Sequence, residues 1–313
     1  MKMENIDSVY NNNETATLIL NDKYESFLSD DYIIFKNMLD DVKSLNISHI
    51  IIKGMNYSCY EKFREFLEEN NPDIKIVWRI QMKELKEIKG NAHMYSKKDQ
   101  ILCNLDFRLD SKEVIYSILN KMKEIFKISV IYKVGKDNFV DALNVIAEIS
   151  QHIDTSIVVS PNMEADSSNK LNWPQLDQLY GELIEFNIKR KNPKATLMDL
   201  GILPSRLLNE HPCNGYVCYK DTCHSKKNDL PRRIVVKRNG CLLPENERVN
   251  SKLIMGNIGR EPLSVVLSKY QISYEHKLFK DVCKSLYIKW IPTNPYRVVP
   301  WGELLVEESY GIE

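Results

Sequence analysis

Short apolar runs and longer amphipathic segments alternate along the first 200 residues. In the longer segments, for example over 112–126 and 138–151, apolar side chains recur every three or four positions, which predicts helices with one buried face. The short runs predict strands, and their continuous apolar character is typical of a parallel sheet covered on both faces. Six strands are predicted, at 16–20, 49–53, 74–80, 101–107, 128–134 and 155–160.

The regular alternation of strand and helix predicts an α/β fold built from βαβ units. Six units are too few for a closed eight-stranded barrel, so they indicate an open barrel or a doubly wound sheet. No glycine-rich phosphate-binding loop follows the first strand, because residues 20–24 read Leu-Asn-Asp-Lys-Tyr. Nucleotide-binding sheets of that type are therefore disfavoured.

The pattern changes between residues 195 and 210, where prolines and glycines interrupt the chain. Beyond it, Asn239-Gly240 separates two apolar runs, 232–236 and 241–244, which is a strong signal for a β-hairpin. A helix is predicted over 180–191, before this change, and short helices over 262–270 and 277–286 after it. We therefore predict two domains, 1–200 and 201–313.

Composition and charge exclude several classes of protein. The chain is 43% hydrophobic, and its 43 basic residues equal its 43 acidic residues. A protein that coats nucleic acid carries a large basic excess, so no nucleic-acid partner is expected. No apolar run approaches the roughly 18 residues of a spanning helix, and the first residues lack the apolar core of a signal peptide. We expect a cytoplasmic protein with no membrane partner.

Four of the seven cysteines gather within a short stretch of the chain. An odd total without a secretion signal argues against a disulfide framework. Thiolates bind zinc and iron–sulfur clusters, so the group is a candidate site for either cofactor, with His211 and His224 as nearby substitute ligands. The alternative is a set of reduced thiols retained from an ancestor that bound a cluster. The four candidate metal ligands are Cys213, Cys218, Cys223 and Cys241.

Three segments of the C-terminal part, 233–244, 255–259 and 262–268, resemble the SPASM domain that accompanies many radical S-adenosylmethionine enzymes that modify peptides. Residues 132–144 are similar to the fifth strand and following helix of the radical S-adenosylmethionine partial barrel. The resemblance extends over roughly residues 15–270. It implies an open (β/α)6 partial barrel with a small C-terminal SPASM-like extension of a hairpin and helices.

The sequence departs from this family where the family holds its cofactors. The family carries Cys-x-x-x-Cys-x-x-Cys after the first strand, whereas residues 21–28 read Asn-Asp-Lys-Tyr-Glu-Ser-Phe-Leu. After the second strand, only Gly54 remains of the family's Gly-Gly-Glu-Pro-like motif. Glu245 follows Pro244, where the family has a cluster cysteine. No S-adenosylmethionine cluster and no reductive cleavage of S-adenosylmethionine are expected.

Three further features leave alternatives open. Arg79, Asp106 and Arg108 lie at the ends of predicted strands, where a barrel places functional groups, but each is equally explained as a salt-bridged rim residue. Residues 220–238 carry seven basic and two acidic side chains, which suits an acidic partner or a solvated hairpin edge. The segment 290–301, with two tryptophans and three prolines, either wraps another subunit, lines a substrate groove or packs on its own domain.

These observations predict a non-catalytic partner of a peptide-modifying system. The resemblance implies that it binds a precursor peptide, an active maturase subunit of the radical S-adenosylmethionine type, or both. Strand addition at a sheet edge is one way to hold an extended peptide. Two alternatives remain: an enzyme of peptide natural-product maturation that uses zinc or iron at the residual cysteines, and a structural scaffold protein.

Overall fold

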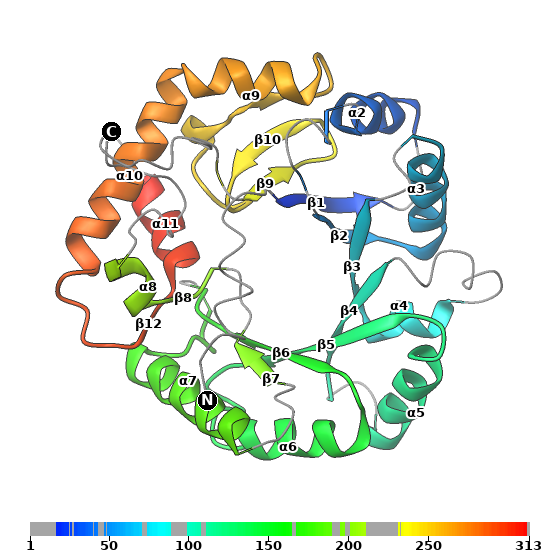
Figure 1. Cartoon of the computed structure of the whole chain (residues 1–313), viewed down its shortest axis with the longest axis vertical. Helices are drawn as coiled ribbons and strands as arrows, with labels where there is room; N and C mark the ends of the chain where they lie inside the picture. The colour runs from blue at the N-terminus through cyan, green and yellow to red at the C-terminus, as the bar shows by residue number, and fades with distance from the viewer. Residues whose placement is uncertain are drawn as a thin grey trace. The chain divides into compact units, whose positions relative to one another are not determined.

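The chain forms two compact units, each assembled from segments that lie far apart in the sequence (Figure 1). Unit 1 comprises Met1–Lys75, Ser205–Asn294 and Leu304–Glu313, and unit 2 comprises Ile76–Pro204 and Pro295–Glu303. The computed structural model describes residues 17–24, 26, 28–39, 41–42, 47, 49–70, 74–88, 99–107, 111–164, 167–189, 195–197, 201–210, 231 and 233–311.

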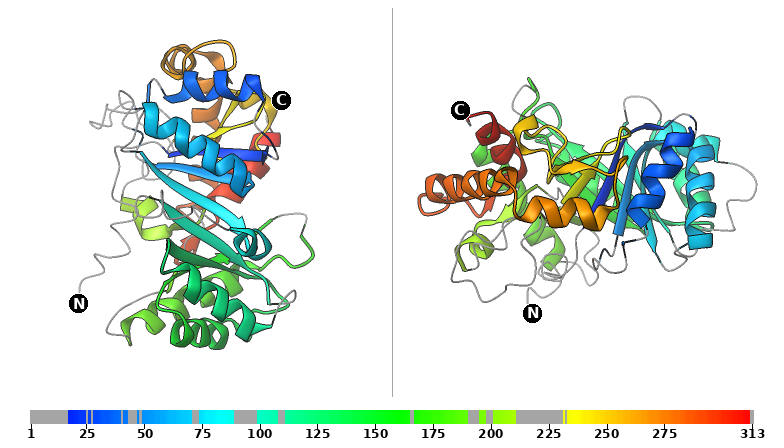
Figure 2. Two further views of the ribbon diagram at one scale, coloured as in Figure 1. Left: turned by 90° about the vertical axis from the view of Figure 1, so that its right-hand side faces the viewer. Right: turned by 90° about the horizontal axis from the view of Figure 1, so that it is seen from above.

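The sheet of unit 1 combines strands from the two ends of the chain in the order β11-β10-β9-β1-β2. β1 pairs in parallel with β2 on one side and with β9 on the other, and β9, β10 and β11 pair antiparallel. α2 (Ser29–Leu39) and α3 (Tyr57–Asn70) cover one face of β1 and β2 (Figure 2). The strands are β1 (Thr17–Tyr24), β2 (His49–Met55), β9 (Arg233–Val236), β10 (Cys241–Pro244) and β11 (Gly256–Asn257).

The remaining elements of unit 1 are helical, and all of them except α8 follow the hairpin in the sequence. α9 packs beside α2, and the backbone N–H of Ser264 donates to Asp41 at 2.8 Å. α8 precedes the hairpin in the sequence, and α11 begins in unit 2 and ends in unit 1. The elements are α8 (Ser205–Glu210), the 3-10 turn η3 (Ser251–Leu253), α9 (Leu263–Gln271), α10 (Tyr274–Trp290) and α11 (Trp301–Tyr310).

Unit 2 contains a parallel sheet in the order β3-β4-β5-β6-β7. α5 and α6 lie on one side of these strands (Figure 1). A short antiparallel pair, β8 with β12, completes the unit. The elements are β3 (Lys75–Gln81), α4 (Met82–Glu87), β4 (Gln100–Leu105), α5 (Lys112–Met122), β5 (Lys127–Val134), α6 (Ala142–His152), β6 (Ser156–Pro161), α7 (Trp173–Ile188), β7 (Ala195–Leu197), β8 (Leu203–Pro204) and β12 (Val298–Val299).

The α/β class, the six strands and the hairpin are all confirmed. Neither unit's sheet closes on itself among the described strands, which agrees with an open rather than a closed barrel. The division into domains 1–200 and 201–313 was placed where the strand–helix repeat ends, and it stays a prediction. The sequence carries no signal that β9 lies parallel to β1, a pairing that joins Leu18 to Ile234 and Leu20 to Val236.

Helix ends differ from their predicted positions for local reasons. α5 ends at Met122 rather than 126, because the next four residues turn and the N–H of Phe126 bonds to the Met122 carbonyl at 2.9 Å. α6 begins at Ala142 because the side chain of Asn138 forms hydrogen bonds in the preceding loop. It accepts one from the backbone N–H of Gly135 and donates one to the hydroxyl of Tyr132. α7 and α10 begin earlier than predicted, at caps formed by Asn172 and Ser273.

The two faces of the unit 2 sheet differ in polarity. Trp78, Ile80 and Cys103 point to the helix side, where the sulfur of Cys103 lies 3.4 Å from that of Met82 in α4. The opposite face carries a small apolar cluster, Leu102, Ile131 and Val158, with polar residues toward the carboxyl ends of the strands. Within the described ranges, no helix is both long and apolar enough to cross a bilayer.

Candidate functional site

The loop after β1 is the place where the resemblance expects a metal cluster. β1 extends through Tyr24, so residues 21–24, predicted as loop, are strand. The loop leads into α2, where the side chain of Asp31 accepts a hydrogen bond from the backbone N–H of Leu28 at 2.8 Å. Asp31 is almost completely buried. A buried carboxylate needs a partner, because an unpaired charge is costly inside a protein.

Arg238, at the turn of the β9–β10 hairpin, is that partner. Its guanidinium contacts both carboxylate oxygens of Asp31, with Nη2 at 3.1 Å and Nε at 3.3 Å. The same group donates to the carbonyl oxygens of Lys23 and Ser26, each at 2.9 Å. The backbone N–H of Arg238 also bonds to Asp22 at 3.3 Å. One side chain therefore ties the loop after β1 to the start of α2 and to the hairpin, and we name this arrangement the Arg238 clasp.

Cys59, near the start of α3, is electrostatically linked to the Arg238 clasp. Burial raises the pKa of its thiol, and the neighbouring charges of Lys62 and Arg238 only partly oppose this effect. A thiol with a raised pKa stays protonated and is a poor nucleophile. Among the residues that the structure describes, Cys59 also belongs to no group of three side chains that could hold a metal ion.

Gly54 has a structural role at the end of β2. Its φ of +77° is left-handed, and a Cβ added to it would lie 2.4 Å from the backbone oxygen of Asp22. The strand register shifts here, with Asn21 opposite Lys53 and Tyr24 opposite Met55. Two residues of β1 thus face one glycine of β2, as in a β-bulge. The bulge accounts for Gly54 without a ligand.

Polar residues at the carboxyl ends of β3 to β5 form a second candidate region, in unit 2. Nη2 of Arg79 lies 3.3 Å from Oδ1 of buried Asn104, whose amide donates to the Ile80 carbonyl at 3.0 Å. Gln81 and Lys133 are exposed on the same face. Of the other two strand-end residues predicted from the sequence, Asp106 is half-buried and Arg108 lies outside the described residues.

The loop after β5 is closed by its own side chains. The backbone N–H of Asp137 donates to Asn169 Oδ1 at 3.0 Å, and the amide of Asn169 donates back to Asp137 at 2.8 Å. Asn169 also lies so close to Gly135 that a Cβ there would approach it to 2.4 Å. These contacts rigidify the loop that the resemblance identified as part of the partial barrel.

Of the four predicted metal ligands, only Cys241 belongs to the described residues. It is a half-buried free thiol at the start of β10, and burial raises its pKa against the opposing charge of Lys237. Cys213, Cys218 and Cys223 lie outside the described residues, as do His211 and His224. Among the residues that are described, no three histidine, cysteine or acidic side chains are arranged to hold a metal. The convergence of the four cysteines remains a prediction.

Glu245, in the position of a family cluster cysteine, is held by an arginine. Its carboxylate lies 3.1 Å from Nε of Arg233 and accepts the Arg233 backbone N–H at 3.2 Å. The side chain of Glu245 is fully buried, and its backbone has a left-handed φ of 62°. Burial raises the pKa of Cys283, in α10, well above its usual value, and the charge of Glu245 adds to this effect. Glu245 therefore does not fit a metal-ligand role here.

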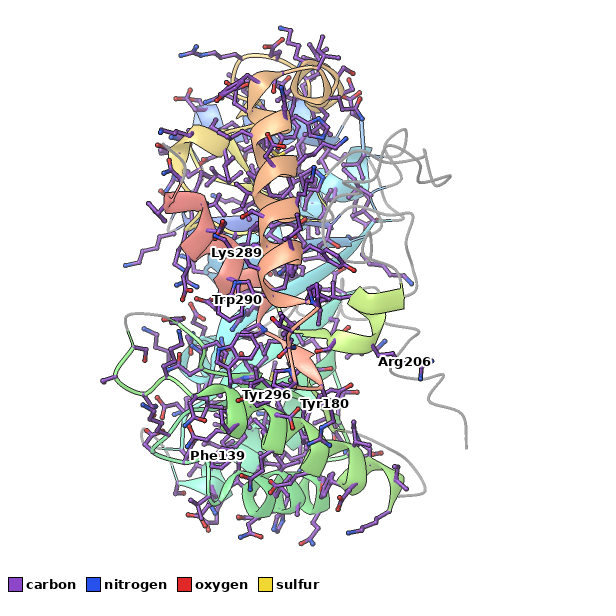
Figure 3. All side chains as sticks on the ribbon, turned by 90° about the vertical axis from the view of Figure 1, so that its left-hand side faces the viewer. Phe139, Tyr180, Arg206, Lys289, Trp290 and Tyr296 are labelled. Atoms are coloured by element: carbon purple, nitrogen blue, oxygen red, sulfur yellow. The ribbon has the colours of Figure 1, made fainter. Side chains whose placement is uncertain are left out.

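The tryptophan- and proline-rich arm packs on the chain's own α7. Tyr296, labelled in Figure 3, stacks on Trp173 with ring centroids 5.7 Å apart. Arg297 forms an ion pair with Asp177 at 3.0 Å, and Val298–Val299 pairs with Leu203–Pro204. Among the three alternatives that the sequence left open, these contacts favour an arm that packs on its own chain.

Low pH should weaken the packing of residues 296–300 on α7. Burial alone would raise the pKa of Asp177, but hydrogen bonds from the side chain and backbone of Arg297 lower it overall. The stabilisation is therefore complete above the ordinary aspartate pKa of about 4 and is lost as pH falls below it. Hydrogen exchange of residues 296–300 should be slower in wild type than in Asp177→Asn at pH 7, and the difference should shrink by pH 3. Asp141→Asn, at an exposed carboxylate, serves as control; a difference independent of pH would contradict the assignment.

The Arg238 clasp is the feature of this candidate site that the sequence does not reveal. Arg238 was noted only as one of seven basic residues, whereas its partner Asp31 lies 207 positions away in the sequence. Hydrophobic periodicity and motif spacing report on neighbours within one element, so they carry no signal for such a contact. The only hint in the sequence is the pair of acidic residues, Asp30 and Asp31, which the structure places in the first turn of α2.

Comparison with known proteins adds evidence on the fold. No protein-family model matches the chain, and no curated protein sequence matches it. Solved structures do match. The structure of anSMEcpe with bound AdoMet covers 95% of this chain and 96% of its own, at 11% identity and a TM-score of 0.61.

Two further solved structures are similar in fold to this chain. The complex of anSMEcpe with AdoMet and the Kp18Cys peptide covers 85% of this chain and 83% of its own, at 13% identity and a TM-score of 0.58. SuiB of Streptococcus suis, bound to S-adenosylmethionine, covers 96% of this chain and 71% of its own, at 13% identity and a TM-score of 0.56. At these identities the similarity concerns the fold, which is the one that the sequence predicted.

Proposed function

We propose that this chain is a non-catalytic partner in a peptide-modifying system, which binds a precursor peptide or an active maturase subunit. The observation that carries the proposal is the Arg238 clasp. The fold is shared with proteins solved with bound AdoMet, yet the loop after β1 lacks cysteines and is bound by an arginine side chain. One of those proteins was also solved with a peptide, which supports peptide binding as the retained property.

The chemistry of the loop argues against cleavage of S-adenosylmethionine. In the family that the sequence resembles, three thiolates hold an iron–sulfur cluster that supplies the electron for that cleavage. Here the end of β1 and the loop after it offer Asp22 and carbonyl oxygens, and these already accept hydrogen bonds from Arg238. A guanidinium is a cation without an acceptor site, so it does not ligate iron. The residues present therefore do not fit the cluster.

We place peptide binding at the carboxyl ends of the strands of the unit 2 sheet, on the face opposite α5 and α6, where the apolar residues are themselves buried. Leu102, Ile131 and Val158 give this face an apolar centre. Gln81 and Lys133 lie toward the carboxyl ends of the strands, where they offer amide and cationic groups. Binding sites commonly combine an apolar lining with a few polar groups that fix orientation. An extended peptide with an acidic residue near Lys133 suits this arrangement.

Binding to the products of neighbouring genes tests the proposal. The probes are the short peptide and the maturase that the proposal expects the neighbouring genes to encode, each labelled and titrated with the full-length chain by fluorescence anisotropy. At least one should bind, and Lys133→Glu should weaken peptide binding roughly tenfold by reversing one charge contact. Lys127→Glu is the matched control, because Lys127 is equally exposed on the same face of β5 at its opposite end. Binding of neither probe, or peptide binding weakened equally in both variants, would refute the proposal.

The cysteine group adds a separate proposal. We expect Cys213, Cys218, Cys223 and Cys241 to bind about one zinc or iron per chain, with sulfur about 2.3 Å from the metal if zinc is bound. Cys218→Ser should release that metal and increase hydrogen exchange within 205–250, because metal binding contributes to local folding. Cys59→Ala, which changes a thiol outside the group, should keep it. A chain that binds no metal after anaerobic reconstitution with either ion would contradict this expectation.

A further inference from the structure

Three polar residues lie side by side where three neighbouring parallel strands of unit 1 end. Asn21 of β1 pairs with Lys53 of β2. On the other side of β1, Leu20 pairs with Val236 of β9, so the next residue along each strand brings Lys237 beside Asn21. Figure 1 shows β9, β1 and β2 in this order. We name Lys53, Asn21 and Lys237 the strand-end row.

The strand-end row lies on the side of the sheet that α2 and α3 do not cover. Ile50 and Ile52 of β2 are fully buried, whereas Ile51, between them, is half-buried. Side chains alternate along a strand, so Lys53 points to the same side as Ile51. Neighbours in register on adjacent strands share a face, which places the rest of the row on this side too. All three residues of the row are half-buried.

The row brings two positive charges to the same place. Adjacent strands are about 4.8 Å apart, so the Cα atoms of Lys53 and Lys237, two strands apart, are separated by about 10 Å. Lysine has a long flexible stem, which lets both ammonium groups reach a ligand above Asn21. An ammonium has three N–H donors, so it can hold an anion beside a partner that it already has.

The two acidic side chains at this end of the hairpin are engaged elsewhere. Asp31 is paired with Arg238, and Asp22 accepts backbone N–H groups. Within the part of the chain that the structure describes, Lys237 takes part in no ion pair, and the side chain of Asn21 makes no hydrogen bond. Lys237 and Arg238 both belong to the basic segment 220–238, but only Arg238 is bound within the Arg238 clasp.

We propose that the strand-end row binds the phosphate group of a small molecule that carries a phosphate monoester. Such a group has a charge of about −1.5 to −2 at neutral pH and three acceptor oxygens. Two ammonium groups match this charge, and the amide of Asn21 supplies a further donor. A carboxylate has one charge and two oxygens, and the planar fork of arginine suits it better than two lysines do.

The position of the row agrees with this assignment. Open α/β sheets commonly bind ligands just beyond the carboxyl ends of their parallel strands, and the row lies at that end of β1 and β2. The site is independent of the proposed peptide binding, which rests on the strand ends of unit 2. Loss of one would therefore leave the other unaffected.

Calorimetric titration of the full-length protein in a phosphate-free buffer tests the proposal. Ribose 5-phosphate is the probe and should bind, whereas ribose, which lacks the phosphate, should not. Lys53→Gln and Lys237→Gln should each weaken binding of the probe at least tenfold, because each removes one charge contact. Asn21→Asp should abolish it by placing a carboxylate between the two lysines. Lys36→Gln, at an exposed lysine of α2, is the matched control and should leave binding unchanged.

Four results would overturn the proposal: no binding of ribose 5-phosphate, equal binding of ribose, the same loss in Lys36→Gln, or full affinity in both lysine variants of the row. Inorganic phosphate that binds as tightly as ribose 5-phosphate would identify free phosphate as the ligand, against the monoester. The backbone N–H of Lys237 donates to the carbonyl of Cys241, a proposed metal ligand. If Cys218→Ser also abolished binding, the phosphate would be held by a metal instead of the row. Thermal denaturation checks that each variant is folded.

Discussion

Replacing Arg238 with alanine should reduce the free energy of unfolding of unit 1 by about 3 kcal/mol, because it leaves the buried carboxylate of Asp31 without its cation. The substitution also removes the guanidinium hydrogen bonds to Lys23 and Ser26. The loss of stability should appear first in the segment that contacts Arg238. Hydrogen exchange of residues 20–34 should accelerate, and urea denaturation should begin at a lower concentration than in wild type.

Two comparisons make this result specific. Lys237→Ala removes an adjacent, half-exposed basic residue and should change stability by less than about 0.5 kcal/mol. In the double variant Arg238→Ala, Asp31→Asn, the loss should be smaller than the sum of the two single losses, because both substitutions break one ion pair. If the two losses are additive, or Lys237→Ala has the same effect, the Arg238 clasp does not hold the loop.

Replacing Glu245 with alanine should have a comparable effect at the other end of the hairpin. The substitution leaves Arg233, whose side chain is 13% exposed, without its partner, which should cost about 3 kcal/mol. Differential scanning calorimetry of the full-length chain should show a lower transition temperature for the part of the protein that contains the hairpin.

The backbone of Glu245 allows a sharper comparison. Its left-handed φ of 62° is unfavourable for alanine and for glutamate, but not for glycine. Glu245→Gly should therefore be more stable than Glu245→Ala by about 1 kcal/mol, although both lose the ion pair. Glu245→Gln should lie closer to wild type, since its amide oxygen still accepts a hydrogen bond. Equal stability of the glycine and alanine variants would show that the left-handed conformation is not maintained.

The parts of the fold that could be predicted are those encoded locally. Strands and helices follow from apolar periodicity, and the hairpin follows from Asn239-Gly240, where Gly240 has the positive φ of 81° that a tight turn requires. The caps at Asn172 and Ser273 were missed although they are local, because the predicted helices were placed by their apolar residues alone.

The parts that could not be predicted depend on distant pairing. The parallel alignment of β9 with β1 and the ion pair of Arg238 with Asp31 join residues that are more than 200 positions apart. Such contacts are set by how whole elements pack, so spacing within one segment contains no information about them. The loop after β1 shows both cases: its lack of cysteines is readable from the sequence, but the arginine that binds it is not.

Formation of 5′-deoxyadenosine tests the central claim most directly. The full-length chain is reconstituted anaerobically with iron and sulfide, and then incubated with S-adenosylmethionine, a strong reductant and the neighbouring peptide. Chromatography should detect no 5′-deoxyadenosine above a protein-free control, while the neighbouring maturase, treated in the same way, should produce it. Product that increases with the concentration of this chain would contradict the account, because the loop held by Arg238 would then have to support the cleavage that it is proposed to have lost.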